Sequence, residues 1–359
     1  MIHLLIEKNY VNNSRTDMML AGVTTVAKKK RLAIRTYKHC EDLPDDVSAV
    51  ILVCASLKYA SEMIEALNER HIHPVLFGFQ YLDTVYRYSE LTFTYSKSMY
   101  RLTKYLLRKI GGGKTAFVGY NEDSLPDKLK LMGVRRATRE MGEECKVFKN
   151  YGNIIDCLDR FEADCEDVRL IVCSNDSIAI IIHSLRPYLE QGRQICSCAG
   201  LRISDFIDQP YPRTKINYYK AGEQLAELYL FLLKRKEIYS TEMTLEFDID
   251  FGEVPAEEAE DITNNLIYSR QIIDFYGDRG IAEVEKLEQM LLKCDETDLK
   301  LLEALIQGKS YEKISEEYYF SPNTVKYRVR AMIANSGTDS KKNLVELLKK
   351  YRLSFSEKR

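Results

Sequence analysis

The sequence of 359 residues contains no uninterrupted apolar window of about 18 residues, the length that a membrane-spanning helix requires. Its first residues, "MIHLLIEKNYV", lack a basic segment, and they reach Glu7 and Lys8 too early for the apolar part of a secretory leader. The sequence therefore predicts a cytoplasmic protein without a membrane partner.

The cysteine pattern is not that of a zinc or redox site. Nine cysteines are present, but no two of them have the C-x-x-C spacing. Cys196 and Cys198 would point to the same face of a strand. Two roles are therefore open to them, one in metal or redox chemistry and one in packing. Their apolar neighbours favour packing, in which a thiol behaves as a small hydrophobic group. We expect no metal ion and no cofactor.

The common catalytic motifs are also absent. The sequence has no G-x-x-x-x-G-K-[ST], no H-E-x-x-H and no G-x-S-x-G, and its five histidines are scattered. In "IGGGKTA", Lys114 opens a predicted strand rather than following one, so the glycines indicate a turn and not a phosphate loop. These absences argue against an enzyme.

Charge is distributed unevenly along the chain. The formal net charge is only −2, yet residues 321–359 hold ten Lys/Arg against three Asp/Glu, a balance of +7. Residues 241–261 hold nine acidic residues and no basic one. A polyanion would therefore bind at the C-terminal end.

Short β-rich runs alternate with amphipathic helical stretches over the first 240 residues. This alternation is typical of an α/β fold, and nearly continuous apolar runs are typical of parallel strands. The number of strands favours two lobes, with a crossing near residues 93–97. Strands are predicted to begin at Ile2, Arg31, Ala49, Pro74, Lys114, Cys145, Arg169, Gln194 and Thr214, and helices to cover residues 57–70, 97–110, 125–141 and 177–190.

Residues 214–252 leave one question open, and residues 281–293 leave another. The strand and helix of "TKINYYKAGEQLAELYLFLLKR" either close the second lobe or return to the first. "MTLEFDIDFG" alternates apolar and polar residues, which predicts one further strand. Two connector helices follow, over residues 256–275 and 281–293, and the near-heptad apolar residues of the second would pack on a partner copy or on their own chain.

The C-terminal 60 residues are predicted to form four short helices, over residues 298–307, 311–319, 322–335 and 339–351. The third has two distinct faces. Apolar side chains share one stripe, namely Val325, Val329, Met332 and Ile333. Long donors and an aromatic residue share another face, namely Asn323, Lys326, Tyr327 and Arg330. This second face is either solvated surface or a surface that meets phosphates and base edges.

The same region resembles the LuxR-type (GerE-type) helix-turn-helix, whose pattern is "GxSxxEIAxxLxxSxxTVxxHV". The chain reads "GKSYEKISEEYYFSPNTVKYRV", with departures at Ser315, Tyr318 and Arg328. The resemblance implies that the helix over residues 322–335 enters the major groove of double-stranded DNA. It implies contacts to bases or phosphates from Ser321, Asn323, Thr324, Lys326, Tyr327, Arg330, Lys341 and Lys342.

The first 250 residues resemble the ligand-binding domain of lactose-repressor-type regulators, which has a periplasmic-binding-protein-like fold. The stretches "SAVILVCAS", "KTAFVGYNEDSLPDKLKLMGVRRATREMG" and "LIVCSNDSIAI" carry this resemblance. "AGLR" stands where the family usually has "G-(F/Y)-D-D". The family's usual N-terminal helix-turn-helix has no counterpart, because Met1 already opens the first strand.

The resemblance implies a cleft between the lobes that binds a small polar ligand, such as a sugar. Because Arg202 replaces an acidic turn, an anionic or phosphorylated metabolite is an alternative, and so is a cleft read by a partner protein. For Asn175 and Asp176, capping of the following helix is an alternative to ligand binding. The implied ligand-binding residues are Asn9, Tyr10, Ser56, Tyr120, Asp123, Lys128, Asn175, Asp176 and Arg202.

Together these features predict a bacterial, ligand-responsive transcriptional regulator that acts as a homodimer. The predicted domains are a two-lobe sensor (residues 1–252), a helical connector (253–293) and a DNA-binding domain (294–359). The alternative is a cytoplasmic solute-binding protein whose helical tail is a protein-interaction module. That alternative predicts ligand affinity without salt-dependent binding to a duplex.

Overall fold

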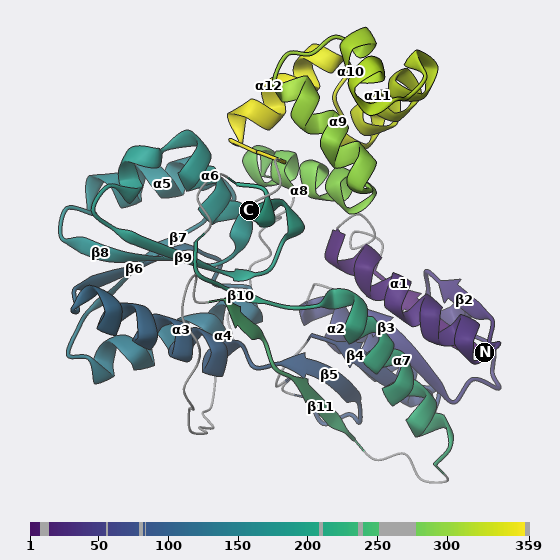
Figure 1. Ribbon diagram of the computed structural model, residues 1–359. Coiled ribbons are helices and arrows are strands. Elements are labelled where there is room, and N and C mark those ends of the chain that lie inside the picture. Colours follow the sequence, from purple (N-terminus) through teal and green to yellow (C-terminus); the bar gives the residue numbers. More distant parts are fainter. Residues whose placement is uncertain are drawn as a thin grey trace. The chain divides into compact units, whose positions relative to one another are not determined.

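A computed structural model describes residues 1–7, 14–54, 57–78, 82, 84–207, 211–235, 240–250 and 278–355. The chain divides into two compact units (Figure 1). The first comprises Met1–Ser98, Asp123–Leu129 and Ile216–Asp248, and the second comprises Met99–Glu122, Lys130–Lys215 and Ile249–Arg359. None of the helices in the described ranges is long and apolar enough to cross a membrane.

The first unit contains a parallel six-stranded sheet in the order β11-β5-β4-β3-β1-β2. Its central strands are buried along their whole length, as the apolar runs of the sequence predict. Helix α2 (Leu57–Glu69) packs on the sheet through Ala60, Ile64 and Leu67. The strands are β1 (Ile2–Ile6), β2 (Ile34–Tyr37), β3 (Ala49–Val53), β4 (His73–Phe77), β5 (Ser89–Phe93) and β11 (Glu242–Leu245).

Helices α1 (Ser14–Lys29) and α7 (Tyr218–Leu233) of the first unit pack closely on one another. Two glycines permit this approach. A Cβ atom on Gly22 would lie 2.0 Å from the backbone oxygen of Tyr219, and one on Gly222 would lie 1.9 Å from that of Met19. Any larger residue at either position would therefore push the two helices apart.

The second unit contains another six-stranded sheet, in the order β12-β10-β9-β8-β6-β7. Helices α3 (Tyr95–Ile110) and α4 (Leu125–Glu140) lie on one side of it, and α5 (Ile154–Ala163) and α6 (Asp176–Leu185) lie on the other (Figure 1). The strands are β6 (Lys114–Tyr120), β7 (Cys145–Lys149), β8 (Val168–Cys173), β9 (Gln194–Ala199), β10 (Arg213–Lys215) and β12 (Asp248–Asp250).

The open question about residues 214–252 is resolved. Strand β10 joins the second sheet, whereas the following α7 belongs to the first unit, so this segment does both things that the sequence allowed. The single strand predicted for "MTLEFDIDFG" is wrong, because β11 pairs with β5 and β12 lies beside β10. Phe247 lies between the two strands, and its ring packs against that of Tyr95 with 5.0 Å between ring centroids.

The helix predicted over residues 177–190 is shorter in the structure. Helix α6 ends at Leu185, and a 3-10 helix, η3 (Pro187–Glu190), follows it. Proline disfavours helical backbone at the residue before it, and Arg186 accordingly leaves the helix with φ −138°.

The C-terminal part of the second unit is helical. Helix α8 (Arg279–Leu292) precedes α9 (Glu296–Ile306), α10 (Tyr311–Tyr318), α11 (Pro322–Ser336) and α12 (Lys341–Lys350). We refer to residues 295–355 as the head. Side chains of Asp278, Asp295, Ser310, Ser321 and Ser340 cap the starts of these helices. This architecture confirms the predicted class, an α/β two-lobe fold with an all-helical C-terminal region.

The apolar stripe of α8 packs within its own chain. Ile281, Val284, Leu287 and Leu291 are at most 1% exposed and belong to a hydrophobic cluster that runs from the second sheet into the head. The second of the two packing alternatives is therefore correct, and this stripe is not open to a partner copy. The other predicted connector helix, over residues 256–275, lies outside the described residues.

Candidate functional site

Helix α11 has the two faces that the sequence predicts. Val325 and Val329 are fully buried and Met332 is 3% exposed, so these side chains anchor the helix in the head. Lys326 and Arg330 are exposed, and Tyr327 is 76% exposed. Neither cation forms an ion pair with any residue in the described ranges. The exposed face therefore presents two cationic side chains to solvent.

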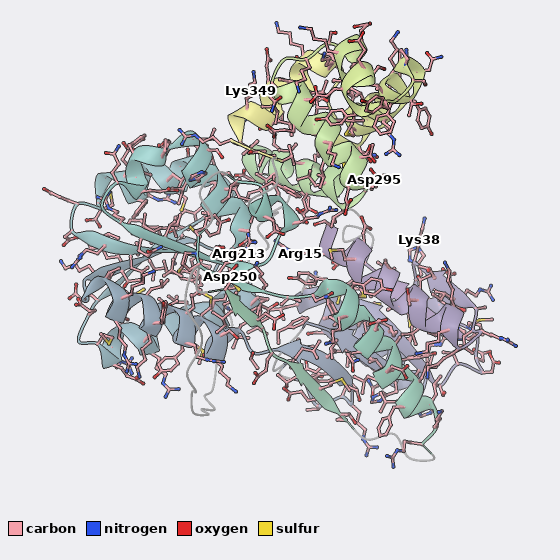
Figure 2. The ribbon with its side chains drawn as sticks, viewed as in Figure 1. Arg15, Lys38, Arg213, Asp250, Asp295 and Lys349 are labelled. Atoms are coloured by element: carbon pink, nitrogen blue, oxygen red, sulfur yellow. The ribbon has the colours of Figure 1, made fainter. Side chains whose placement is uncertain are left out.

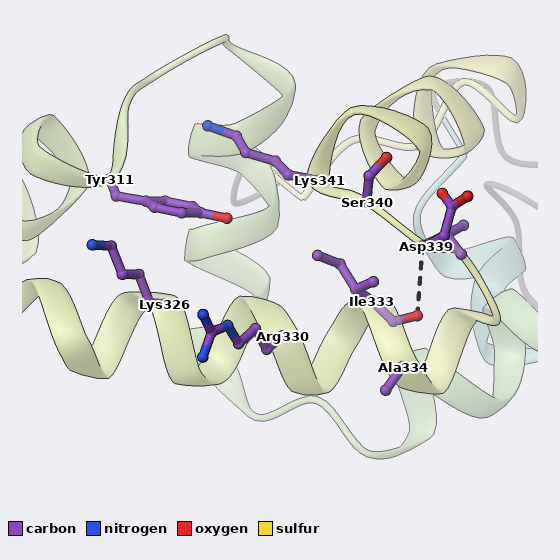
Figure 3. A pocket seen from close by; sticks show the side chains of 9 residues that line it. Tyr311, Lys326, Arg330, Ile333, Ala334, Asp339, Ser340 and Lys341 are labelled. Atoms are coloured by element: carbon purple, nitrogen blue, oxygen red, sulfur yellow. Dashed lines mark hydrogen bonds between the residues drawn. The ribbon is translucent and has the colours of Figure 1, made fainter.

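An open hollow of about 580 Å³ lies beside this face, between α11 and the starts of α10 and α12. Lys326 and Arg330 border it from α11, and Tyr311 and Lys341 border it from the other two helices (Figure 3). The Nζ atom of Lys341 lies 4.6 Å from the centre of the Tyr311 ring. Partial burial raises the pKa of Tyr311, so its hydroxyl stays protonated as a donor at neutral pH. Three cationic side chains and one carboxylate, that of Asp339, thus border the hollow.

The first turn of α11 also presents hydrogen-bonding groups to solvent. The Ser321 hydroxyl oxygen accepts a hydrogen bond from the backbone N–H of Thr324 over 3.1 Å, and Asn323 is exposed beside them. Unpaired N–H groups at a helix N-terminus attract phosphates. Of the two lysines that open α12, Lys342 is 83% exposed in its side chain, whereas Lys341 donates to the backbone oxygen of Lys309 over 3.2 Å.

Arg328 has a structural contact that the sequence did not suggest. It stands where the LuxR-type pattern has histidine, and it donates to Asp298 over 2.8 Å and to Asp295 over 2.9 Å. Asp295 caps the start of α9 (Figure 2). The backbone N–H of Asp298 and then Arg328 hold the pKa of Asp295 below its usual value. Arg328 thus joins α11 to α9. In the sequence, its spacing of four residues from the apolar Met332 gave no indication of this contact.

In the second unit, Asn175 and Asp176 lie where β8 leads into α6. Asn175 caps α6 by accepting a hydrogen bond from the N–H of Ile178 over 3.3 Å. Asp176 is fully buried, and its carboxylate accepts hydrogen bonds from the N–H of Leu201 over 2.6 Å and from the hydroxyls of Ser204 and Ser197. Asn175 therefore caps α6, and Asp176 organises the turn after β9.

Arg202 begins that turn, the 3-10 helix η4 (Arg202–Asp205). Its backbone N–H donates to Glu288 over 2.9 Å, and its guanidinium donates to the backbone oxygen of Leu291. Both partners belong to α8. In this structure the side chain predicted to contact a ligand is thus bound to the helix that leads into the head.

The remaining predicted ligand-binding residues are dispersed. Tyr120 ends β6 after an irregularity in its pairing with β7, and it is half-buried. Asp123 and Lys128 are half-buried and belong to the first unit. Asn9, Tyr10 and Ser56 lie outside the described residues. The structure therefore groups three of the predicted residues around one turn, namely Asn175, Asp176 and Arg202.

The two cysteines considered for metal or redox chemistry are packing residues. Cys196 and Cys198 are fully buried in β9, and burial raises the pKa of the Cys196 thiol. In the part of the chain that the structure describes, no His, Cys, Asp and Glu side chains group as metal ligands would.

Similarity to solved structures is found at the level of the fold. A LacI-family regulator from Enterococcus faecium with bound ribose has a TM-score of 0.56 at 13% identity, covering 69% of this chain and 96% of that one. A LacI-family regulator from Clostridium acetobutylicum has a TM-score of 0.55 at 16% identity, covering 69% and 98%. About 69% of this chain thus shares the two-lobe α/β fold of these structures.

The same fold is also similar to a glucose–galactose-binding protein from Geobacillus stearothermophilus, with a TM-score of 0.56 at 12% identity, covering 69% of this chain and 96% of that one. No protein-family model matches the chain, and no curated protein sequence matches it either. The fold is therefore compatible both with regulators and with solute-binding proteins, and the choice between them depends on the head.

Proposed function

We propose that this protein is a DNA-binding transcriptional regulator whose two α/β units sense a small molecule and whose head binds a duplex. The observation that carries this proposal is the exposed face of α11. Lys326 and Arg330 form no ion pair within the described part of the chain, while Val325 and Val329 hold the helix in the head. Lys and Arg at such positions suit guanine edges and phosphates.

The geometry of the head supports a helix-turn-helix of LuxR type. Helices α10 and α11 pack on one another and are joined by a short turn in which Tyr319 adopts left-handed backbone, with φ 57°. Lys326, Tyr327 and Arg330 would meet base edges. The N-terminal residues of α11 (Ser321, Asn323 and Thr324) would meet phosphates, together with Lys341 and Lys342 of α12. Such a protein would act in the cytoplasm, where bacterial DNA lies.

The sensor would take a small polar ligand. The E. faecium structure contains ribose, which motivates sugars as the first class to test. We propose Asn175 as a direct contact, because it is at the end of a parallel strand, where ligands bind in folds of this class. Lys128 motivates anionic or phosphorylated sugars as the second class to test. A homodimer that reads two half-sites also remains part of the proposal, with an interface other than the buried stripe of α8.

The solute-binding alternative is favoured by one observation, the similarity to the glucose–galactose-binding protein. It assigns the head to protein interaction and leaves the cations of α11 without a role. The two proposals therefore differ in one measurable property, which is affinity for a duplex.

Selection of bound sequences from a random duplex pool tests the proposal, using the purified full chain with and without ribose, glucose, galactose and their phosphates. We expect enrichment of a defined sequence and a change in its occupancy with one of the ligands. Thermal stabilisation by a sugar, combined with no enrichment of any sequence, would instead establish the solute-binding alternative.

A further inference from the structure

Glu288 is a buried carboxylate that the proposed DNA-binding and sensor residues leave unexplained. It lies on α8, is 2% exposed, and accepts hydrogen bonds from two consecutive backbone N–H groups of η4. One oxygen is 2.9 Å from the nitrogen of Arg202, and the other is 2.6 Å from that of Ile203. A buried carboxylate is costly unless such donors are present, so the position of α8 is tied to the position of η4.

The opposite side of η4 is held by the sensor lobe. Asp176 accepts hydrogen bonds from the N–H of Leu201 and from the hydroxyl of Ser204. Residues 201–204 are therefore held by two buried carboxylates at once, one at the start of α6 and one on α8. A displacement that breaks the bonds to Asp176 also misaligns the N–H groups that Glu288 requires.

The side chain of Arg202 adds a second contact to α8. Its guanidinium donates to the backbone oxygen of Leu291, in the last turn of that helix. That oxygen also accepts a hydrogen bond from the backbone N–H of Cys294 over 3.2 Å, and a cation at a helix C-terminus interacts favourably with the helix dipole. Arg202 therefore stabilises the end of α8 from which the chain continues into the head.

The residues that follow η4 contact the head itself. The backbone N–H of Ser354 donates to the oxygen of Phe206 over 2.8 Å, and Ile207 forms an isolated β-bridge with Leu353. The rings of Phe206 and Phe355 pack with 5.0 Å between centroids. Residues 201–207, which we name the relay segment, thus contact Asp176, α8 and the C-terminal end of the head.

The head is in turn fixed to α8. Helix α11 packs on α8, Lys293 donates to Asn335 over 3.1 Å, and the Tyr351 hydroxyl donates to Glu283 over 3.0 Å. The head cannot leave α8 without breaking these bonds and opening the hydrophobic cluster that they share.

We propose that the relay segment is the element through which the ligand state of the second lobe sets the placement of the head, with Arg202 and Glu288 as its positioning residues. This inference rests on the proposed sensor function. It assigns Arg202 to transmission rather than to ligand contact. Because the hydrogen-bond donors around the buried carboxylates of Asp176 and Glu288 are fixed, α8 should occupy discrete positions rather than shift continuously.

Hydrogen–deuterium exchange of the full chain, without DNA or ligand, tests the coupling. Asp176→Asn turns one acceptor oxygen into a donor and perturbs the relay segment from the sensor side. We expect the exchange rate of the backbone amides in α8 and in residues 351–355 to rise about tenfold. This rise corresponds to the stabilisation lost with one hydrogen bond to a charged group. Exchange in β6 and α3 should stay within error of the wild type.

Glu288→Gln and Arg202→Ala break the same coupling from the α8 side. Each should raise exchange in α8 and the head, and adding Asp176→Asn to Glu288→Gln should add little, because the connection is already lost. Arg193→Ala is the matched control: Arg193 donates to three backbone oxygens of the same lobe, those of Val168, Leu189 and Cys165, and none of them belongs to α8. It should leave exchange in α8 unchanged.

An effect of Asp176→Asn that is confined to residues 174–205 would overturn the proposal. If Asp176→Asn does not fold, Ser204→Ala removes one bond to the same carboxylate and has the same expected direction and the same contradicting result. Because exchange is read without DNA, absence of duplex binding would count against the proposed function and not against the coupling.

Discussion

Arg328 lies 2.8 Å from Asp298, whereas Arg330, two residues further along α11, is exposed and has no acidic partner in the described part of the chain. Two arginines of one helix thus have different tasks. One joins α11 to α9 within the head, and the other is available to a molecule outside it. Substituting them one at a time separates stability from binding.

Arg328→Ala should lower the free energy of unfolding of the head by up to about 1 kcal/mol, the value of a partly exposed ion pair. The pKa of Asp295 is lowered in the folded protein, so its stabilising effect is present above the unfolded pKa and is lost as pH falls below it. Below about pH 4, the free energy of unfolding of the variant should therefore depend less on pH than that of the wild type. Thermal unfolding followed from pH 7 to pH 3 measures both effects, and Arg330→Ala should match the wild type throughout.

Val329→Asp should unfold the head. Val329 is fully buried, so an aspartate there would place an unpaired carboxylate in the apolar interior. Circular dichroism should show loss of helix, and duplex binding should disappear with it. A variant that keeps both its helical signal and its melting temperature would show that the stripe of α11 is not the core of the head.

The two lysines at the start of α12 should differ. Lys342 is almost fully exposed, so Lys342→Ala should weaken binding to all duplex sequences alike and reduce the salt slope by about one, without a change in melting temperature. Lys341 also contacts Lys309 and the Tyr311 ring, so Lys341→Ala should lower the melting temperature as well. Equal melting temperatures for the two variants would remove the structural role of Lys341.

His73 should make the first unit sensitive to mild acid. Burial lowers the pKa of His73 to about 4, and its ring nitrogen lies 2.8 Å from the hydroxyl of Ser89. The His73 ring takes up a proton near pH 6.5 in the unfolded chain but only near pH 4 in the folded chain. The free energy of unfolding is therefore at its full value above pH 6.5 and decreases between pH 6.5 and pH 4. The loss should reach about 3 kcal/mol. His73→Gln should flatten this dependence in urea unfolding curves measured from pH 7 to pH 4.

Local features of the sequence predicted the helices of the head well. The stripe through Val325 and Val329 depends on residues a few positions apart, and the structure places it as predicted. Most of the parallel strands were also visible, because buried strands often consist of continuous apolar runs. Strand β5 was not predicted, because its buried sequence, "SELTF", is not such a run. Register, sheet order and the division of residues 242–250 between two sheets were not visible, since they depend on partners far away in sequence.

The predicted ligand-binding residues show a different limit. The pattern "SNDSIA" located the end of a strand correctly, but it could not show that the Asp176 carboxylate is already saturated by Leu201 and Ser204. Arg202 was predicted from a departure in a family pattern. Its actual partners, Glu288 and the Leu291 carbonyl, lie more than 80 residues away in sequence, at separations of 86 and 89. No local pattern could have paired them.

The most direct test of the account is the salt dependence of duplex binding by the full chain, measured beside Lys326→Ala and Arg330→Ala. The account predicts that log affinity falls linearly with log salt concentration, with a slope near −0.9 for each phosphate neutralised. Each substitution should cost about 1–3 kcal/mol of duplex affinity at an unchanged melting temperature. Duplex affinity that neither salt nor these substitutions alter, or no duplex affinity at all, would contradict the account.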